Sequence, residues 1–293
     1  MDRSNLYNLY YLALFGALGG LLAWRLTSLH LVISGFNIYT RDLILGVILG
    51  IVIGGTLFTA EGMSGRSIRR AVKVGVIGAA LGGLGGAVSL PAGEWLFELV
   101  GGSFIGRAIG WAIFGIFIGI AASVTGGTQA PKGAIGGLIG GAVGGLVVEG
   151  IGGGRIGGPY GDALGLVLLG ACVALAVATI TTLLGQSWIE VTEGPMEGKI
   201  FFLDKYLSKS GNPASIGSDP WKSDIYLGGD RGIGSHHAQV ERIGEANRIT
   251  DLGAPGGTSA NGRPISSHTL SDLDSLTIGE TRLLYRERRS VSS

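Results

Sequence analysis

Side chains able to do chemistry are sparse in this sequence, and one group of them lies in the C-terminal third. Two adjacent histidines, His236 and His237, follow Ser235 there, and the cations Lys222 and Arg231 lie upstream in the same region. Side chains of these types can donate hydrogen bonds. Adjacent histidines point in different directions, and no carboxylate or thiol pattern accompanies them. We therefore expect no metal site and no cofactor.

A second group of ionisable side chains lies at the ends of apolar stretches. It comprises Glu61, Glu94, Glu98, Arg107 and Glu149. An ionisable residue inside a membrane is a candidate functional group, but long side chains near the ends of a span can carry their charge to the interface. We expect these residues to do so or to lie in loops, with Glu94 and Glu98 on a short interfacial helix. No proton-carrying chain of residues runs through the apolar stretches, which argues against a transporter.

The remaining composition excludes several classes of function. No nucleophile with a neighbouring base and no pair of catalytic carboxylates appears, so we do not expect an enzyme. The single cysteine, Cys172, lies in an apolar run and excludes an intrachain disulfide. The formal net charge is +1 and no basic stripe is present, so nucleic acid is not an expected partner.

Only 15% of the 293 residues are charged, which is low for a soluble protein. A helix of about 20 apolar residues crosses the hydrocarbon core of a bilayer. Six stretches have this length: 6–24, 43–60, 72–92, 104–124, 133–151 and 162–184. The sequence therefore predicts an α-helical multi-span membrane bundle over 1–187, in contact with the lipid bilayer. The connection 26–41 is short and interrupted; it is an interfacial or re-entrant piece or a further span.

The distribution of cations predicts the orientation of this bundle, because Lys and Arg near the ends of spans are retained in the cytoplasm. The connection between the second and third stretches contains Arg66, Arg69, Arg70 and Lys73. We therefore expect a plasma-membrane protein with this loop, the N-terminus and the C-terminus on the cytoplasmic side.

Glycines recur four residues apart in the apolar stretches, and later stretches resemble earlier ones. We align three glycines of the third stretch with three of the fifth: Gly78, Gly82 and Gly86 with Gly136, Gly140 and Gly144. A two-helix unit at 50–88 thus recurs at 115–148, which indicates a parallel duplication. Such glycines allow close approach of helix backbones. We expect helix packing at these positions, either within one bundle or between the subunits of a homo- or hetero-oligomer.

From residue 188 the pattern changes to short β-rich runs, which Gly, Pro and Asn separate at intervals of about ten residues. This pattern predicts an all-β sandwich over 188–289, followed by a tail at 290–293. Few residues separate the sandwich from the last apolar stretch, so we expect it close to the membrane surface.

The motifs of this C-terminal region resemble those of the forkhead-associated (FHA) domain family. The frame of the family is present in order, as Ile216-Gly217, Asp224-Ile225-Tyr226-Leu227, His237-Ala238, Asp251-Leu252-Gly253, Gly257-Thr258 and Asn261-Gly262. The resemblance implies a β-sandwich whose loops at one end bind a phosphothreonine peptide.

The resemblance also implies roles for individual residues. In the family, an arginine, a serine and an asparagine hold the phosphothreonine, and their positions are occupied here by Ser218, Gly234 and Gly256. Candidate substitutes in the same loops are Lys222, Arg231, Ser235 and His236. The residues that shape the loops and the following turn in the family correspond to Gly217, His237, Thr258, Asn261 and Gly262.

Three functions follow from this reading. We favour a non-enzymatic membrane protein whose FHA-like module binds a protein partner without phosphate, as an adaptor, scaffold or assembly subunit of a membrane complex. The first alternative is a receptor for phosphothreonine peptides in kinase signalling. The second is a channel or transporter gated by the FHA-like domain, which requires a polar path through the helices.

Overall fold

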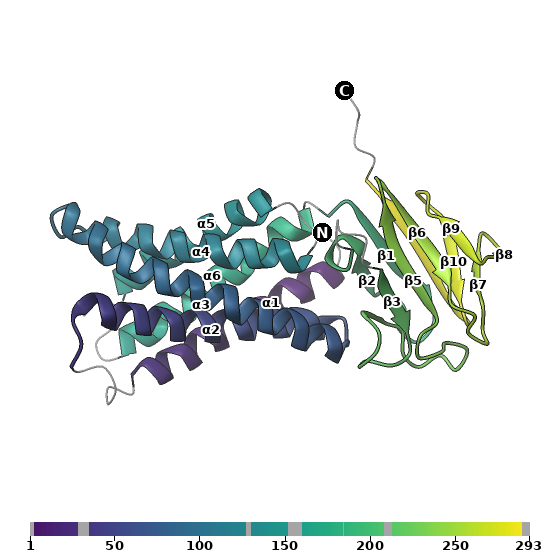
Figure 1. Ribbon diagram of the computed structural model, residues 1–293, viewed down its shortest axis with the longest axis horizontal. Helices are drawn as coiled ribbons and strands as arrows, with labels where there is room; N and C mark the ends of the chain where they lie inside the picture. Colours follow the sequence, from purple (N-terminus) through teal and green to yellow (C-terminus); the bar gives the residue numbers. More distant parts are fainter. Residues whose placement is uncertain are drawn as a thin grey trace, which may run out of the picture.

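The computed structural model describes residues 3–28, 35–126, 130–151, 160–183, 185–207 and 213–288. It shows an elongated molecule, with a helical bundle at one end and a β-sandwich at the other (Figure 1). The predicted tail at 290–293 and residues 29–34 of the predicted connection 26–41 lie outside the described residues.

In the described ranges, six helices form the bundle, and each is long and apolar enough to cross a membrane. They are α1 (Arg3–Thr27), α2 (Ile38–Ser64), α3 (Ile68–Leu99), α4 (Phe104–Gly126), α5 (Ala130–Ile151) and α6 (Gly161–Leu183). The second and third helices run well past the apolar stretches 43–60 and 72–92, because the backbone bonds of a helix do not require apolar side chains.

The prediction of a separate interfacial helix for Glu94 and Glu98 is wrong. Helix α3 continues through Pro91 to Leu99, so both glutamates belong to α3 itself. Proline usually ends a helix in water, but helices of membrane proteins tolerate it where neighbouring groups satisfy the freed backbone.

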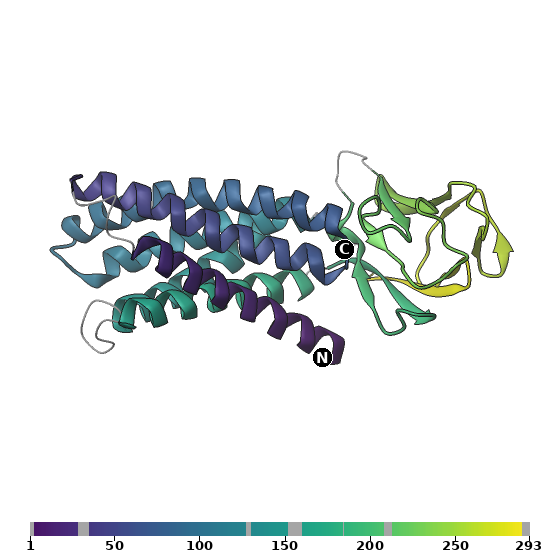
Figure 2. The same cartoon turned by 90° about the horizontal axis from the view of Figure 1, so that it is seen from below.

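The six helices form a closed ring, because each packs against its neighbours in the chain and α1 also packs against α6. Figures 1 and 2 show the helices running side by side along the long axis of the molecule. Apolar side chains fill the centre of the bundle, among them Ile53, Ile118 and Leu169, each 0% exposed. Around these three residues, the described part of the bundle is a packed apolar core and lacks the polar lining that an ion path requires.

Glycines make the contacts between α2 and α3. Three pairs face each other: Gly46 with Gly86, Gly50 with Gly82, and Gly54 with Gly78. A methyl group added at Gly50 would collide with the carbonyl oxygen of Gly82, so the two backbones approach closely because neither residue carries a side chain.

The contacts between α4 and α5 repeat this arrangement in a register that differs from the predicted one. The facing pairs are Trp111 with Gly141, Gly115 with Gly137, and Gly119 with Gly133. Gly136, Gly140 and Gly144 instead face α6, where a methyl group at Gly144 would lie 2.9 Å from the Cα atom of Leu169. The predicted alignment was therefore wrong by about one helical turn, because α5 carries glycines four apart on two faces.

The described part of the β-sandwich contains eleven strands. They are β1 (Ser187–Glu193), β2 (Ile200–Phe202), β3 (Ala214–Gly217), β4 (Ile225–Tyr226), β5 (Ala238–Ile243), β6 (Ala246–Asp251), β7 (Thr258–Ala260), β8 (Arg263–Pro264), β9 (Ser267–Thr269), β10 (Ser275–Ile278) and β11 (Thr281–Glu287). One sheet has the order β2-β1-β11-β10-β7-β8 and the other β4-β3-β5-β6-β9. All described pairs are antiparallel except β3 with β4. Alternate residues such as Ile189, Ile216 and Tyr285 fill the core between the sheets.

The passage from α6 to β1 is short and is held by the 3-10 helix η3 (Leu203–Lys205). The buried carboxylate of Asp204 accepts hydrogen bonds from the backbone N–H groups of Gln186 (2.6 Å) and Ser187 (3.1 Å). The guanidinium of Arg242 also donates to Asp204, at 2.7 Å. The sandwich therefore begins at the end of the bundle with little free chain between them.

Candidate protein-binding site

Three loops meet at one end of the β-sandwich: β3–β4 (218–224), β4–β5 (227–237) and β6–β7 (252–257). Ser218 joins the first two loops, because its backbone N–H donates to the carbonyl of Gly234 (3.0 Å) and its hydroxyl donates to the carbonyl of Ile233 (2.7 Å). The side chain at this position therefore stabilises the loops rather than presenting a donor to a ligand.

Two of the three predicted ligand positions are glycines that allow close packing. A methyl group at Gly256 would collide with the carbonyl oxygen of Gly232 and lie 2.9 Å from the Cα atom of Gly279. An asparagine at this position would therefore require the loops to separate. Gly234 has more room, since a methyl group there would lie 3.2 Å from the Cβ atom of Ala254.

His237 fastens the loop end from the inside. Its ring is 0% exposed, its Nδ1 atom accepts from the backbone N–H of Gly234 at 3.2 Å, and its Nε2 atom lies 2.9 Å from the carbonyl oxygen of Gly257. This pattern assigns the ring proton to Nε2, which donates to Gly257. Both ring nitrogens are thus engaged by the backbone of two loops, which leaves neither for a metal ion. Gly217 lies beside this clamp and is buried.

The other predicted loop-shaping residues lie at the start and at the far end of β7. The hydroxyl of Thr258 donates to Asp251 at 2.6 Å. Asn261 and Gly262 form the two-residue turn between β7 and β8, with φ angles of +52° and +76°. Such left-handed angles favour Asn and Gly. The side chain of Asn261 also donates to Asp274 at 2.8 Å, so this turn is a structural feature away from the three loops.

Asp230 is a loop residue that the sequence analysis did not identify. Its carboxylate accepts hydrogen bonds from the N–H groups of Gly232 and Glu280 (both 2.8 Å) and from the hydroxyl of Thr281 (2.7 Å). Burial raises the pKa of Asp230, but these hydrogen bonds outweigh burial and bring the pKa below its ordinary value. The Asp-x-Gly spacing at 230–232 is the sequence signal of this Asx turn.

The candidate substitutes form the exposed part of the loop end. Arg231, Ser235 and His236 are exposed in the β4–β5 loop, and Leu252, 45% exposed, begins the β6–β7 loop. Lys222 lies in the β3–β4 loop, 3.8 Å from the carboxylate of Asp219. This surface offers hydrogen-bond donors and an apolar side chain, but it lacks the buried arginine fork that fixes a phosphate.

The helical bundle holds the β3–β4 loop directly. The backbone N–H groups of Ile68 (2.9 Å) and Arg69 (3.2 Å), at the start of α3, donate to the carbonyl of Pro220. These are N–H groups that a helix leaves without an internal partner, and the positive end of the helix dipole favours a carbonyl oxygen there. The β3–β4 loop therefore caps α3 across the junction.

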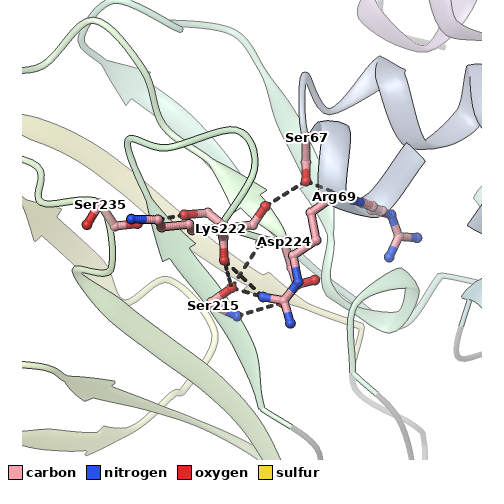
Figure 3. Close-up of polar contacts among 8 residues, drawn as sticks. Ser67, Arg69, Ser215, Lys222, Asp224 and Ser235 are labelled. Carbon is pink, nitrogen blue, oxygen red and sulfur yellow. Dashed lines mark hydrogen bonds and ion pairs between the residues drawn. The ribbon is translucent and has the colours of Figure 1, made fainter. Parts of the chain in front are cut away.

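Side chains complete this contact (Figure 3). The hydroxyl of Ser67, fully buried, donates to the carbonyl of Ser223 at 2.6 Å while accepting from the N–H of Arg70. The guanidinium of Arg69 donates to the carbonyl of Lys222 at 2.9 Å and lies 3.8 Å from the carboxylate of Asp224. One of the three loops is thus bound to the bundle, and β4–β5 carries most of the free polar side chains.

A second contact joins η3 to the end of α2. The ammonium of Lys205 lies 3.1 Å from the carboxylate of Glu61, with side chains 13% and 11% exposed. The guanidinium of Arg70 lies 4.2 Å from the ring centre of Tyr206, and burial raises the pKa of that phenol. The alternative prediction that Glu61 lies in a loop is wrong, because Glu61 belongs to α2, and its charge is paired with Lys205 of the sandwich.

Sequence comparisons relate this end of the chain to known proteins. The family model described as FHA domain matches residues 214–279. The oxoglutarate dehydrogenase inhibitor of Corynebacterium jeikeium is 32% identical over 101 residues, which cover 34% of this chain and 65% of that protein. The protein of the same name from Corynebacterium diphtheriae is 31% identical over 108 residues, or 37% of this chain and 70% of that protein.

A solved structure is similar over the same part of the chain. The FHA domain of the CT664 protein from Chlamydia trachomatis is 31% identical, with a TM-score of 0.31, and the match covers 36% of this chain and 99% of that domain. The match to the Corynebacterium jeikeium protein thus spans less than two thirds of that protein, whereas the match to the Chlamydia trachomatis domain spans nearly the whole domain.

Proposed function

Because the chain belongs to the FHA-domain family through its C-terminal β-sandwich, we propose that the protein is a non-enzymatic membrane adaptor whose sandwich binds a protein partner. The bundle anchors the sandwich at the cytoplasmic face of the plasma membrane. FHA domains are modules of protein–protein interaction, and six apolar helices supply the anchor.

One observation carries the proposal that the partner is bound without phosphate. The hydroxyl of Ser218 donates to the carbonyl of Ile233, and the other two predicted ligand positions are the glycines Gly234 and Gly256. None of the three offers a charged donor, whereas a phosphate dianion is held by several charge-assisted hydrogen bonds. The loop clamp of His237 nevertheless keeps the loop end in one shape, which favours recognition by shape and polar contacts.

The test is capture of partners by the full chain in nanodiscs, with quantitative cross-linking and a lysate treated or not treated with phosphatase. The variant Arg231→Glu with His236→Ala changes the exposed β4–β5 loop, and Arg263→Glu on β8 is a matched control outside the three loops. We expect the same partner on the wild type and the control, loss with the loop variant, and no effect of phosphatase. Retention by the loop variant would show that the partner does not bind at the loop end.

Arg231, Ser235 and His236 support a second candidate, a receptor for phosphothreonine peptides, because all three are exposed donors in one loop. A degenerate phosphothreonine library and its unphosphorylated counterpart distinguish the two functions. A gain in affinity of tenfold or more with phosphate, lost on phosphatase treatment, would replace the first proposal with this one.

A further inference from the structure

A cavity of about 520 Å³ lies at the end of the helical bundle opposite to the β-sandwich. It forms where α1, α3 and α5 end and α2, α4 and α6 begin, and all six helices contribute to its wall. The sandwich contacts the other end of α2 and α3. The volume lies in the range of sites for small organic molecules.

The two copies of the helix repeat place ionisable residues at corresponding positions of this wall. In the register set by the facing glycines, Glu94 of α3 corresponds to Glu149 of α5, and Asp42 of α2 corresponds to Arg107 of α4. All four line the cavity. The cavity therefore lies where the two repeats meet, at one end of the bundle.

The polar groups of the wall are only partly satisfied by one another. Arg107 donates twice to Glu94, at 2.9 and 3.2 Å, and Glu94 is 7% exposed. Glu149 accepts at one oxygen from the indole N–H of Trp111 at 3.2 Å. Ser89 is fully buried, and among the described residues its hydroxyl makes one hydrogen bond, a long one of 3.5 Å to the carbonyl of Gly86.

The wall contains more acidic than basic side chains. It contains four carboxylates and two guanidinium groups, contributed by Asp42, Glu94, Glu149, Asp162, Arg41 and Arg107. Arg107 is paired with Glu94. The other three carboxylates belong to Asp42, Glu149 and Asp162, and the one other cation of the wall is Arg41. Arg41 is half exposed and lies 3.8 Å from Asp42. The alternative expectation that Glu94 lies in a loop is wrong, because Glu94 belongs to α3 and lines this cavity.

We propose that this cavity binds a small organic cation that carries an ammonium group. The free carboxylate oxygens accept its N–H groups, and the indole rings of Trp24 and Trp111, both in the wall, suit the positive charge and the apolar part. The proposal is independent of the partner of the sandwich, because the two sites lie at opposite ends of the molecule.

The experiment uses the full chain in nanodiscs of uncharged lipid and three probes of nearly equal shape: benzylammonium, benzyl alcohol and benzoate. Calorimetric titration should show saturable binding of benzylammonium at least tenfold tighter than that of benzyl alcohol, and no binding of benzoate. Glu149→Gln removes one charged acceptor and should weaken benzylammonium binding about tenfold or more. Asp42→Asn, on a different helix, should weaken it in the same direction.

The matched control is Glu98→Gln, on α3 at the same end of the bundle but outside the cavity wall, with the benzylammonium affinity expected to stay unchanged. Thermal unfolding of each variant checks that the bundle is intact. Equal binding of benzyl alcohol, preferred binding of benzoate, no binding to the wild type, or equal loss in the control would each overturn the proposal.

Discussion

Replacing Lys205 with methionine tests how firmly the sandwich is bound to the bundle. Methionine keeps much of the apolar stem but removes the charge, so Glu61 is left without the ammonium that lies 3.1 Å away. Both side chains are nearly buried, at 13% and 11% exposed. Removal of one partner from a buried ion pair costs about 3–5 kcal/mol, because the other charge remains away from water.

We take the lower end of this range, about 3 kcal/mol, since a little water reaches both groups and the charge of Arg70 still acts on Glu61. The cost falls on the docked arrangement, because undocking lets Glu61 regain water. The population of the undocked state should therefore rise roughly a hundredfold.

Amide hydrogen exchange of Ile68 and Arg69 measures this population. Their N–H groups donate to the carbonyl of Pro220, a bond that exists only while the sandwich is docked. In nanodiscs, the Lys205→Met variant should exchange these two amides roughly a hundredfold faster, whereas the exchange of the central part of α3 should stay unchanged.

Two comparisons decide whether the reasoning holds. Glu193→Gln breaks an exposed ion pair with Arg282 on the same sandwich, and we expect a cost of about 0–1 kcal/mol and no change at Ile68. The double variant Glu61→Gln with Lys205→Met should recover part of the protection, since the carboxylate that lost its ammonium is removed as well, while the nearby charge of Arg70 remains. An unchanged exchange rate in Lys205→Met, or simple additivity in the double variant, would refute the ion-pair argument.

Three further predictions concern packing, the loop clamp and pH. Gly50→Leu forces a side chain against the Gly82 carbonyl and should destabilise the bundle by about 1–3 kcal/mol in thermal unfolding, whereas Gly150→Ala has open space and should be neutral. His237→Ala removes two buried hydrogen bonds and should lower the free energy of unfolding by about 2–4 kcal/mol in chemical denaturation of the full chain. The variant should also lose partner capture. Unchanged capture would contradict the role of His237 in shaping the loop end. Asp230→Asn should destabilise the sandwich at neutral pH, and the difference from the wild type should shrink as pH falls below about 4. The folded pKa of Asp230 is lowered, so its stabilisation is present above the unfolded pKa and is lost as the carboxylate is protonated; a constant difference from pH 7 to 3 would contradict this.

Much of the fold could be predicted from periodicity and motifs. Apolar stretches long enough for a bilayer became α1 to α6, because burial in lipid or protein requires helices with satisfied backbones. The motifs around Gly217, His237 and Asn261 predicted the FHA sandwich, and the match over residues 214–279 confirms it. These signals are local, since each depends on residues close together in the chain.

The register of the helix repeat is a feature that local sequence patterns could not predict. On α5, Gly133, Gly137 and Gly141 are spaced like Gly136, Gly140 and Gly144, so the sequence alone allows two alignments one turn apart. The neighbours decide between them, because the first set faces α4 and the second faces α6.

Residue types and short spacings were enough to predict the six apolar helices and the FHA fold, and they predict that the phosphate-ligand positions are occupied by Ser218, Gly234 and Gly256. The folded arrangement was needed to show that the β3–β4 loop caps α3 and that Glu94 and Glu149 line one cavity. Both depend on groups that lie far apart in the chain: the cap of α3 forms when the sandwich docks on the bundle, and the cavity forms when the ring of helices closes. An isolated charge at the end of an apolar stretch has the same sequence signature whether it faces water, lipid or a partner, and packing selects among these surroundings.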